Sequence, residues 1–180
     1  MYSMELLQAK EIDFDRITDF YRRVIEHTEG MERYACWKYG LHPTDQMIRR
    51  YIQTGAMYYC EKDGAIIAAV ALTPSQGEDY HGAAWSQDLP DDEVAVVHIL
   101  CVDPRMQKQM IAKKLMAMVI SLARGSSKGA VRLDALACNV PAQHLYEALG
   151  FSRRGKQRWH TENVGWTDFF LYEFPLTEEC

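Results

Sequence analysis

A segment rich in amide and basic side chains has the residue types and the position of an anion site. It runs from Val102 to Ala112 and leads from an apolar, β-branched run into a helical pattern. The first turn of a helix leaves backbone N–H groups without acceptors, and the helix dipole adds positive charge there. Residues 103 to 132 carry seven basic side chains and one acid, a net charge of +6. The pattern favours a phosphate site, although a solvated basic helix face gives the same charges.

A histidine in the apolar run before this segment has the chemistry of a base. Strict alternation along 94 to 102 places His98 on one face with Leu100 and Val102. An imidazole with a pKa of about 6.5 accepts a proton from an ammonium, directly or through water. A histidine among apolar residues is more often a satisfied core group, so both roles stay open.

Aromatic and acidic residues supply a third kind of chemistry, the attraction of a cation. Residues 75 to 93 contain six acidic side chains and no Lys or Arg. Tyr80 and Trp85 lie in this stretch, and Trp37 follows the first predicted helix. Together they are candidates for holding a cationic amine, with a solvated loop anchored by ordinary aromatic residues as the alternative. Arg132 and Asp134 share one face of a later strand and are expected to pair.

The elements that must position these residues follow from periodicity and from turn residues. The sequence predicts helices over 12–25, from Thr44 to Gly55, over 111–125, and from Pro141 to Gly150. It predicts strands over 57–61 and 65–72, joined by a Lys62-Asp63-Gly64 turn, and over 94–102, 130–137 and 164–174.

The order of these elements predicts a mixed α/β sheet with helices on both faces. The helix between strands 94–102 and 130–137 makes those two strands parallel neighbours, whereas the hairpin makes the earlier pair antiparallel. Ligands in open α/β sheets usually lie beyond the carboxyl ends of parallel strands. Residues 102 to 112 and 138 to 146 are therefore the expected site.

One motif carries a family resemblance. Residues Asn139 to Phe151 match N-x-x-A-x-x-L-Y-x-x-L-G-F throughout, and Asn139 has the side chain of a helix cap. With the strand that ends in Val102-Asp103-Pro104, the stretch 94–151 resembles the core of the GCN5-related N-acetyltransferase (GNAT) superfamily. The resemblance implies one domain over residues 1–180, with a mostly antiparallel sheet, one parallel strand pair and flanking helices.

The resemblance also implies acetyl-CoA as donor and a primary amine, on a small molecule or a peptide, as acceptor. The amine would attack the thioester directly. Tyr146 matches the family tyrosine that protonates or hydrogen-bonds the coenzyme sulfur, and His98 resembles a histidine that some members use in proton removal. The implied donor contacts are Leu100, Cys101, Val102, Gln107, Lys108, Gln109, Met110, Ile111, Ala112, Asn139, Ala142 and Tyr146.

The coenzyme loop departs from the family pattern. Gln107 and Ala112 fit Q/R-x-x-G-x-G/A, but Met110 replaces its first glycine, and Lys108 fills another position that is commonly small. Glycine there lets a pyrophosphate approach the backbone closely. The Met110 side chain either turns toward the core or crowds the phosphates, and the sequence leaves both open.

Composition limits the function classes. The chain has 180 residues, 48% hydrophobic and 25% charged, with a net charge of −5. This favours one packed domain and argues against nucleic-acid and membrane partners. Five scattered cysteines without a C-x-x-C pair indicate a cytoplasmic protein without a metal site. The resemblance makes a homodimer a common form. A non-catalytic acyl-CoA-binding regulatory module and a protein-interaction scaffold remain alternatives.

Overall fold

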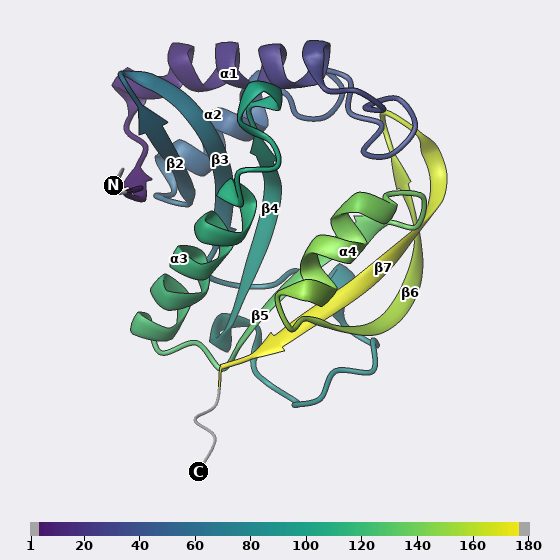
Figure 1. Cartoon of the computed structure of the whole chain (residues 1–180). Coiled ribbons are helices and arrows are strands. Elements are labelled where there is room, and N and C mark those ends of the chain that lie inside the picture. Colours follow the sequence, from purple (N-terminus) through teal and green to yellow (C-terminus); the bar gives the residue numbers. More distant parts are fainter. Residues whose placement is uncertain (1–3, 177–180) are drawn as a thin grey trace.

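Seven strands form one mixed sheet in the computed structural model, which describes residues 4–176. Their order across the sheet is β1-β2-β3-β4-β5-β7-β6, and only β4 and β5 pair in parallel (Figure 1). The expected mixed, mostly antiparallel sheet is confirmed. The strands are β1 (Leu7–Gln8), β2 (Met57–Lys62), β3 (Ala65–Thr73), β4 (Val94–Val102), β5 (Ala130–Leu136), β6 (Ser152–Thr161) and β7 (Gly165–Pro175).

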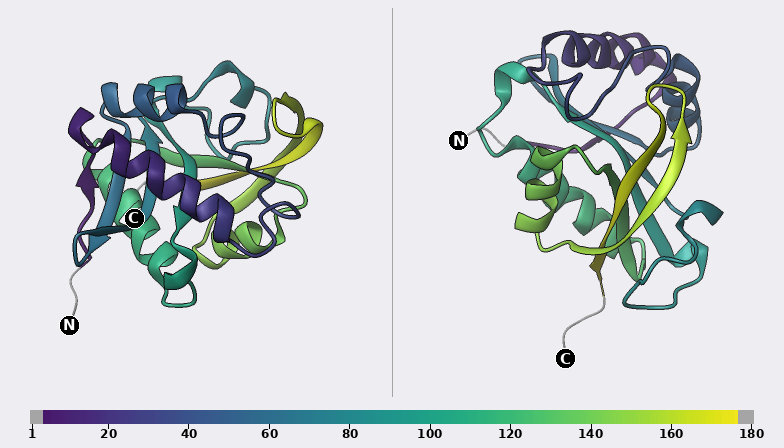
Figure 2. Two further views of the ribbon diagram at one scale, coloured as in Figure 1. Left: turned by 90° about the horizontal axis from the view of Figure 1, so that it is seen from above. Right: turned by 90° about the vertical axis from the view of Figure 1, so that its right-hand side faces the viewer.

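Four helices cover the two faces of this sheet. Helices α1 (Phe14–His27) and α2 (Asp45–Gln53) enclose one apolar core with residues of β2, β3 and β4. Helices α3 (Ile111–Gly125) and α4 (Val140–Ala148) enclose the other core on the opposite face (Figures 1 and 2). Within residues 4–176, no helix has the length and apolar character needed to cross a membrane.

Local signals define the ends of several elements as predicted. The Thr44 side chain accepts a hydrogen bond from the Met47 N–H at the start of α2, and Gly55 after its end has φ +70°. Asp63 and Gly64 have φ of +51° and +77°, the left-handed pair of a tight hairpin turn. Helix α1 lies two residues later than expected, because a short 3₁₀ turn over Glu11–Asp13 precedes it.

The bounds of the two-residue strand β1 and of the long strand β6 were not indicated by the sequence. Strand β6 lies at the edge of the sheet and pairs with β7 along its whole length, but none of its side chains is fully buried. Without an apolar face, it lacks the alternation that marks a half-buried strand. The polar stretch 75–93 is a loop, as expected, apart from short 3₁₀ turns at Glu78–Tyr80 and Asp91–Glu93.

The parallel pair separates soon after it begins. Strand β4 pairs with β5 only from Val94 to Val96. Farther along, Ile99 has φ +44°, and the register with β3 shifts opposite it. This bulge places His98 and Ile99 on the α1–α2 face, whereas Leu100 and Val102 pack on the opposite face. The strict alternation expected for this strand, with His98 beside Leu100, is therefore wrong.

Candidate active site

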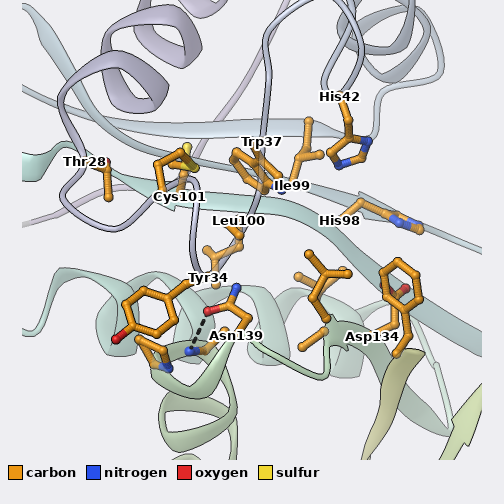
Figure 3. Close-up of a pocket in the computed structure, with 18 of the residues that line it drawn as sticks. Thr28, Tyr34, Trp37, His42, His98, Ile99, Leu100, Cys101, Asp134 and Asn139 are labelled. Atoms are coloured by element: carbon orange, nitrogen blue, oxygen red, sulfur yellow. Dashed lines mark hydrogen bonds between the residues drawn. The ribbon is translucent and has the colours of Figure 1, made fainter. Parts of the chain in front are cut away.

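A cavity of about 640 Å³ opens where β4 and β5 diverge. Its walls come from β4 and the end of β5, from the start of α4, from the segment after α1, and from the β6–β7 hairpin (Figure 3). A cavity at the carboxyl ends of a parallel pair is the expected place for a ligand. Most of the residues singled out from the sequence meet around it.

The β4 edge of the cavity has unpaired backbone. Beyond Val96, the described strands give β4 a neighbour on the β3 side only, so the backbone of Leu100, Cys101 and Val102 borders the cavity without a strand partner. The bulge is fixed from the other face, because the buried Tyr21 hydroxyl donates a 2.8 Å hydrogen bond to the Ile99 carbonyl. The strand thus offers backbone groups to a ligand in the gap.

The loop before α3 has the backbone conformation of a glycine loop, although it lacks the glycine. Lys108 and Met110 have φ of +62° and +60°. The backbone N–H groups from Met110 to Lys113 donate to no acceptor among the described residues, and they lie at the start of a 15-residue helix. The Met110 side chain is 61% exposed and does not line the cavity. It therefore neither packs in the core nor enters the cavity, and the loop keeps the left-handed backbone that a glycine adopts easily.

An ion-pair cluster anchors the start of this loop. Asp103 is buried and accepts hydrogen bonds from the Arg105 backbone and guanidinium, with Arg23 of α1 at 3.4 Å. These cations lower the pKa of Asp103. The +6 net charge of residues 103–132 is not one surface, because Arg132 is buried elsewhere and Lys128 donates to the carbonyls of Pro74 and Asp92. The cations nearest the helix start are Lys108, Lys113 and Lys114.

Of the loop residues expected to contact the donor, Gln107 and Ala112 line the cavity, whereas Lys108 to Ile111 do not.

The next expected contacts come from α4. The Asn139 side-chain carbonyl accepts from the Ala142 N–H at 3.3 Å, so the predicted cap is confirmed. Asn139 and Ala142 both line the cavity.

Tyr146 projects from α4 into the same cavity. Its ring packs against Phe151 and Tyr172, with centroids 6.0 and 5.9 Å away. Its hydroxyl makes no hydrogen bond with any described residue. Burial raises the pKa of Tyr146, so the phenol is protonated at neutral pH. The residue is 8% exposed and lines the cavity, so a hydroxyl without a protein partner is available to a ligand there.

His98 is half-buried and faces the cavity from β4. Its ring stacks on Tyr51, and its Nε2 lies 3.2 Å from the Thr73 hydroxyl. Burial lowers the pKa of His98 to about 4, and the neighbouring His42 adds to the decrease. The imidazole is therefore neutral at neutral pH, but it is a weak base.

Asp134 is the functional candidate that the sequence analysis missed. It faces the cavity from β5, across from His98 (Figure 3), and accepts a 2.6 Å hydrogen bond from the Tyr80 hydroxyl. Burial raises the pKa of Asp134 to about 6. The expected pairing with Arg132 is wrong, because Arg132 binds Glu173 instead. A carboxylate near the carboxyl end of a strand that is mostly apolar was the signal that could have found it.

The predicted aromatic residues separate into two groups. Trp37 and Tyr80 line the cavity, and Tyr80 is only 2% exposed. Trp85 lies outside the cavity: it stacks behind Tyr80, with centroids 5.9 Å apart, and covers the Arg132 guanidinium. On the cavity side, Trp159 stacks on Tyr80, and Phe169 packs against Trp159. These last two rings come from β6 and β7, and the sequence did not single them out.

Solved structures share this fold at low identity. An N-acetyltransferase from Staphylococcus aureus Mu50 has a TM-score of 0.70 and 17% identity, over 98% of this chain and 100% of that one. The ribosomal-protein-S18-alanine N-acetyltransferase from Escherichia coli has a TM-score of 0.70 and 15% identity, over 99% and 97%. The yncA protein from Salmonella typhimurium, solved with its cofactor acetyl-CoA, has a TM-score of 0.68 and 17% identity, over 99% of this chain and 97% of that one.

The sequence itself gives the family. No curated protein matches the chain. The model of the Acetyltransferase (GNAT) family matches residues 16–151, which include both diverging strands, the coenzyme loop and the Asn139–Phe151 motif. The chain therefore belongs to the GNAT acetyltransferase family.

Proposed function

We propose that this protein transfers the acetyl group of acetyl-CoA to a primary amine by direct attack on the thioester. One observation carries the proposal: a single cavity holds a carboxylate with a raised pKa and a tyrosine hydroxyl without a protein partner. These are a proton acceptor and a proton donor. Acetyl-CoA supplies the activated acetyl group and a thiol leaving group.

The chain's own groups offer a complete set of donor contacts. The unpaired N–H groups of residues 110–113 suit the phosphates, with three lysines nearby. The free edge of β4 suits a strand-like hydrogen-bonding partner such as the amide-containing arm of the coenzyme. Asn139 lines the passage between them, and its amide NH₂ remains available because the cap uses only its carbonyl.

Asp134 is the proposed base. With a pKa of about 6, its carboxyl is about 90% ionised at pH 7. His98 is also in its basic form there, but a conjugate acid with a pKa of about 4 is roughly 100-fold more acidic, which makes the imidazole the weaker base. The Asp134 carboxylate takes the proton that the amine loses as its nitrogen bonds to the carbonyl carbon. His98 and Tyr51 form the wall opposite.

Tyr146 is the proposed acid. Its phenol is protonated at neutral pH and has no competing protein acceptor, so it can donate a hydrogen bond or a proton to the sulfur as the C–S bond breaks. The ionised Asp134 and the protonated Tyr146 would thus divide the two proton transfers between them.

The test is amine-dependent release of free thiol from acetyl-CoA by the purified protein. Tyr146→Phe is expected to lower kcat at least ~100-fold, the usual size of a lost acid–base contribution. Acetyl-CoA affinity, measured by calorimetry, is expected to change less than about twofold because the ring remains. Tyr172→Phe is the matched control: its hydroxyl binds Glu147, and it does not line the cavity.

The outcomes separate the function classes. Unchanged turnover in Tyr146→Phe removes this residue from the acid role. Acetyl-CoA binding without thiol release from any amine supports the non-catalytic acyl-CoA-binding module. No binding at millimolar acetyl-CoA overturns both. The cytoplasmic location and the homodimer stay predictions.

A further inference from the structure

The described residues that line the cavity include carboxylates but no lysine or arginine. Among the described residues that line it, three are Asp or Glu, namely Glu29, Asp79 and Asp134, and none is Lys or Arg. Glu29 and Asp79 are exposed to solvent, but an acceptor carboxylate or phosphate beside Asp134 would be desolvated next to a like charge, without a cation to pair with it. Such an arrangement is strongly unfavourable. An ammonium group in the same place is attracted by these carboxylates.

The walls around Asp134 are aromatic. Tyr80 and Trp159 stack with centroids 6.1 Å apart, and Phe169 lies 5.1 Å from Trp159. Tyr51 and Trp37 form the opposite side of the same cavity. Aromatic faces attract cations through their quadrupoles and bury apolar groups well. The surface therefore suits a cationic head joined to an apolar body.

The cavity is also bridged on its outer side. The Asn163 side-chain amide, in the turn between β6 and β7, donates a 2.8 Å hydrogen bond to the Cys36 carbonyl, in the segment after α1. The segment after α1 and the β6–β7 turn meet at one end of the molecule (Figures 1 and 2). Residues on either side of the bridge, such as Tyr34 and Thr161, line the cavity. An extended polypeptide would have to break this hydrogen bond to lie between the two segments.

We propose that the acceptor is a small primary amine with an aromatic or alkyl body and no anionic group. This inference rests on the proposed acetyl transfer and specifies its acceptor. A free amino acid is disfavoured by its carboxylate. A protein N-terminus is disfavoured by the bridge, and by a volume of about 640 Å³ that the reactive arm of the coenzyme must share.

Four matched amines test the proposal: 2-phenylethylamine, phenylalaninamide, phenylalanine and a phenylalanyl tetrapeptide amide. We expect kcat/KM for 2-phenylethylamine to exceed that for phenylalanine and for the peptide at least ~100-fold. Phenylalaninamide has the bulk of phenylalanine without its carboxylate, so we expect its kcat/KM to be closer to that of 2-phenylethylamine than to that of phenylalanine. Equal or faster reaction of phenylalanine or of the peptide overturns the inference and leaves the proposed acetyl transfer intact.

A charge reversal in the cavity sharpens the test. Asp79→Lys is expected to reduce the preference for 2-phenylethylamine over phenylalanine at least ~10-fold, because it supplies the missing cation. Glu78→Lys is the matched control, since Glu78 lies in the same exposed turn but does not line the cavity. If the preference for 2-phenylethylamine over phenylalanine is the same in Asp79→Lys and Glu78→Lys, the charge of the cavity does not select the acceptor and the inference is overturned. Absence of thiol release with all four amines overturns the proposed function together with this inference.

Discussion

At the residue scale, the environment of one carboxyl group decides the chemistry. Asp134 lies between the apolar cavity wall and the Tyr80 hydroxyl 2.6 Å away. Burial raises its pKa to about 6, whereas the hydrogen bond from Tyr80 acts in the opposite direction. The result is a carboxyl group that is ionised at neutral pH, yet a much stronger base than a solvated aspartate.

Asp134→Asn is expected to lower kcat ~100-fold or more and to remove a limb from the pH profile. In the wild type, kcat/KM should rise with pH through about 6 as Asp134 loses its proton. Asp88→Asn, exposed and outside the cavity, should keep that limb. A limb near pH 6 that persists in Asp134→Asn assigns the base elsewhere.

The raised pKa of Asp134 also predicts how the stability of the fold changes with pH. The folded pKa of Asp134 lies above its unfolded value of about 4, so its contribution to stability is complete below pH 4 and is lost as pH rises through about 6. Asn avoids the cost of burying a charge. The melting temperature of Asp134→Asn at pH 8 should therefore be no lower than that of the wild type, which separates lost activity from lost folding.

At the element scale, the start of α3 shows that a loop can keep its shape without its usual residue. Met110 holds the left-handed backbone with φ +60° and directs its side chain to solvent. A left-handed non-glycine residue costs of order 1 kcal/mol, which the anchored Asp103 cluster and the helix on either side of the loop offset.

Met110→Gly should stabilise the fold slightly and leave coenzyme binding nearly unchanged. Relief of backbone strain is partly offset by the greater flexibility of glycine when unfolded, so we expect a gain of roughly 0.5 kcal/mol in the free energy of unfolding. Urea denaturation measures it. Acetyl-CoA affinity should change less than about threefold, because the side chain lies outside the cavity. A tenfold tighter complex would show that Met110 does crowd the phosphates.

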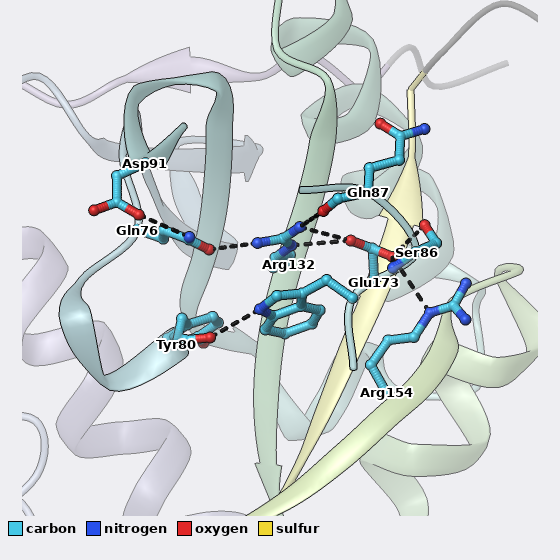
Figure 4. A network of polar contacts seen from close by, with 9 residues as sticks. Gln76, Tyr80, Ser86, Gln87, Asp91, Arg132, Arg154 and Glu173 are labelled. Carbon is cyan, nitrogen blue, oxygen red and sulfur yellow. Dashed lines mark hydrogen bonds and ion pairs between the residues drawn. The ribbon is translucent and has the colours of Figure 1, made fainter. Parts of the chain in front are cut away.

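At the scale of the whole molecule, one buried ion pair joins the sheet to the polar loop. The Arg132 Nε–H donates a 3.0 Å hydrogen bond to a Glu173 carboxylate oxygen between β5 and β7, and a second guanidinium nitrogen lies 2.9 Å from the same oxygen (Figure 4). Arg132 also donates to the Gln76 side chain near the start of the loop and to the Gln87 carbonyl in its second half. The loop carries Tyr80, so this network supports the hydrogen bond to Asp134.

Arg132→Met is expected to destabilise the protein by ~3–5 kcal/mol, because it leaves the buried Glu173 carboxylate without its main cation. Arg132→Met with Glu173→Gln should recover at least half of that loss, since a neutral amide oxygen still accepts from Ser86. Urea denaturation of the two variants measures both. Equal losses would mean that packing, rather than the unpaired charge, dominates.

Local patterns in the sequence predicted most of the elements apart from β6, several of their caps and turns, and the family motif from Asn139 to Phe151, because these signals lie within a few neighbouring residues. The tertiary structure decided the rest. The Tyr80–Asp134 and Asn163–Cys36 contacts join residues 54 and 127 positions apart. The bulge at Ile99 changes which face carries His98 and Leu100. The pKa values and the charge balance of the cavity depend on burial among segments distant in sequence, and no local pattern encodes that burial.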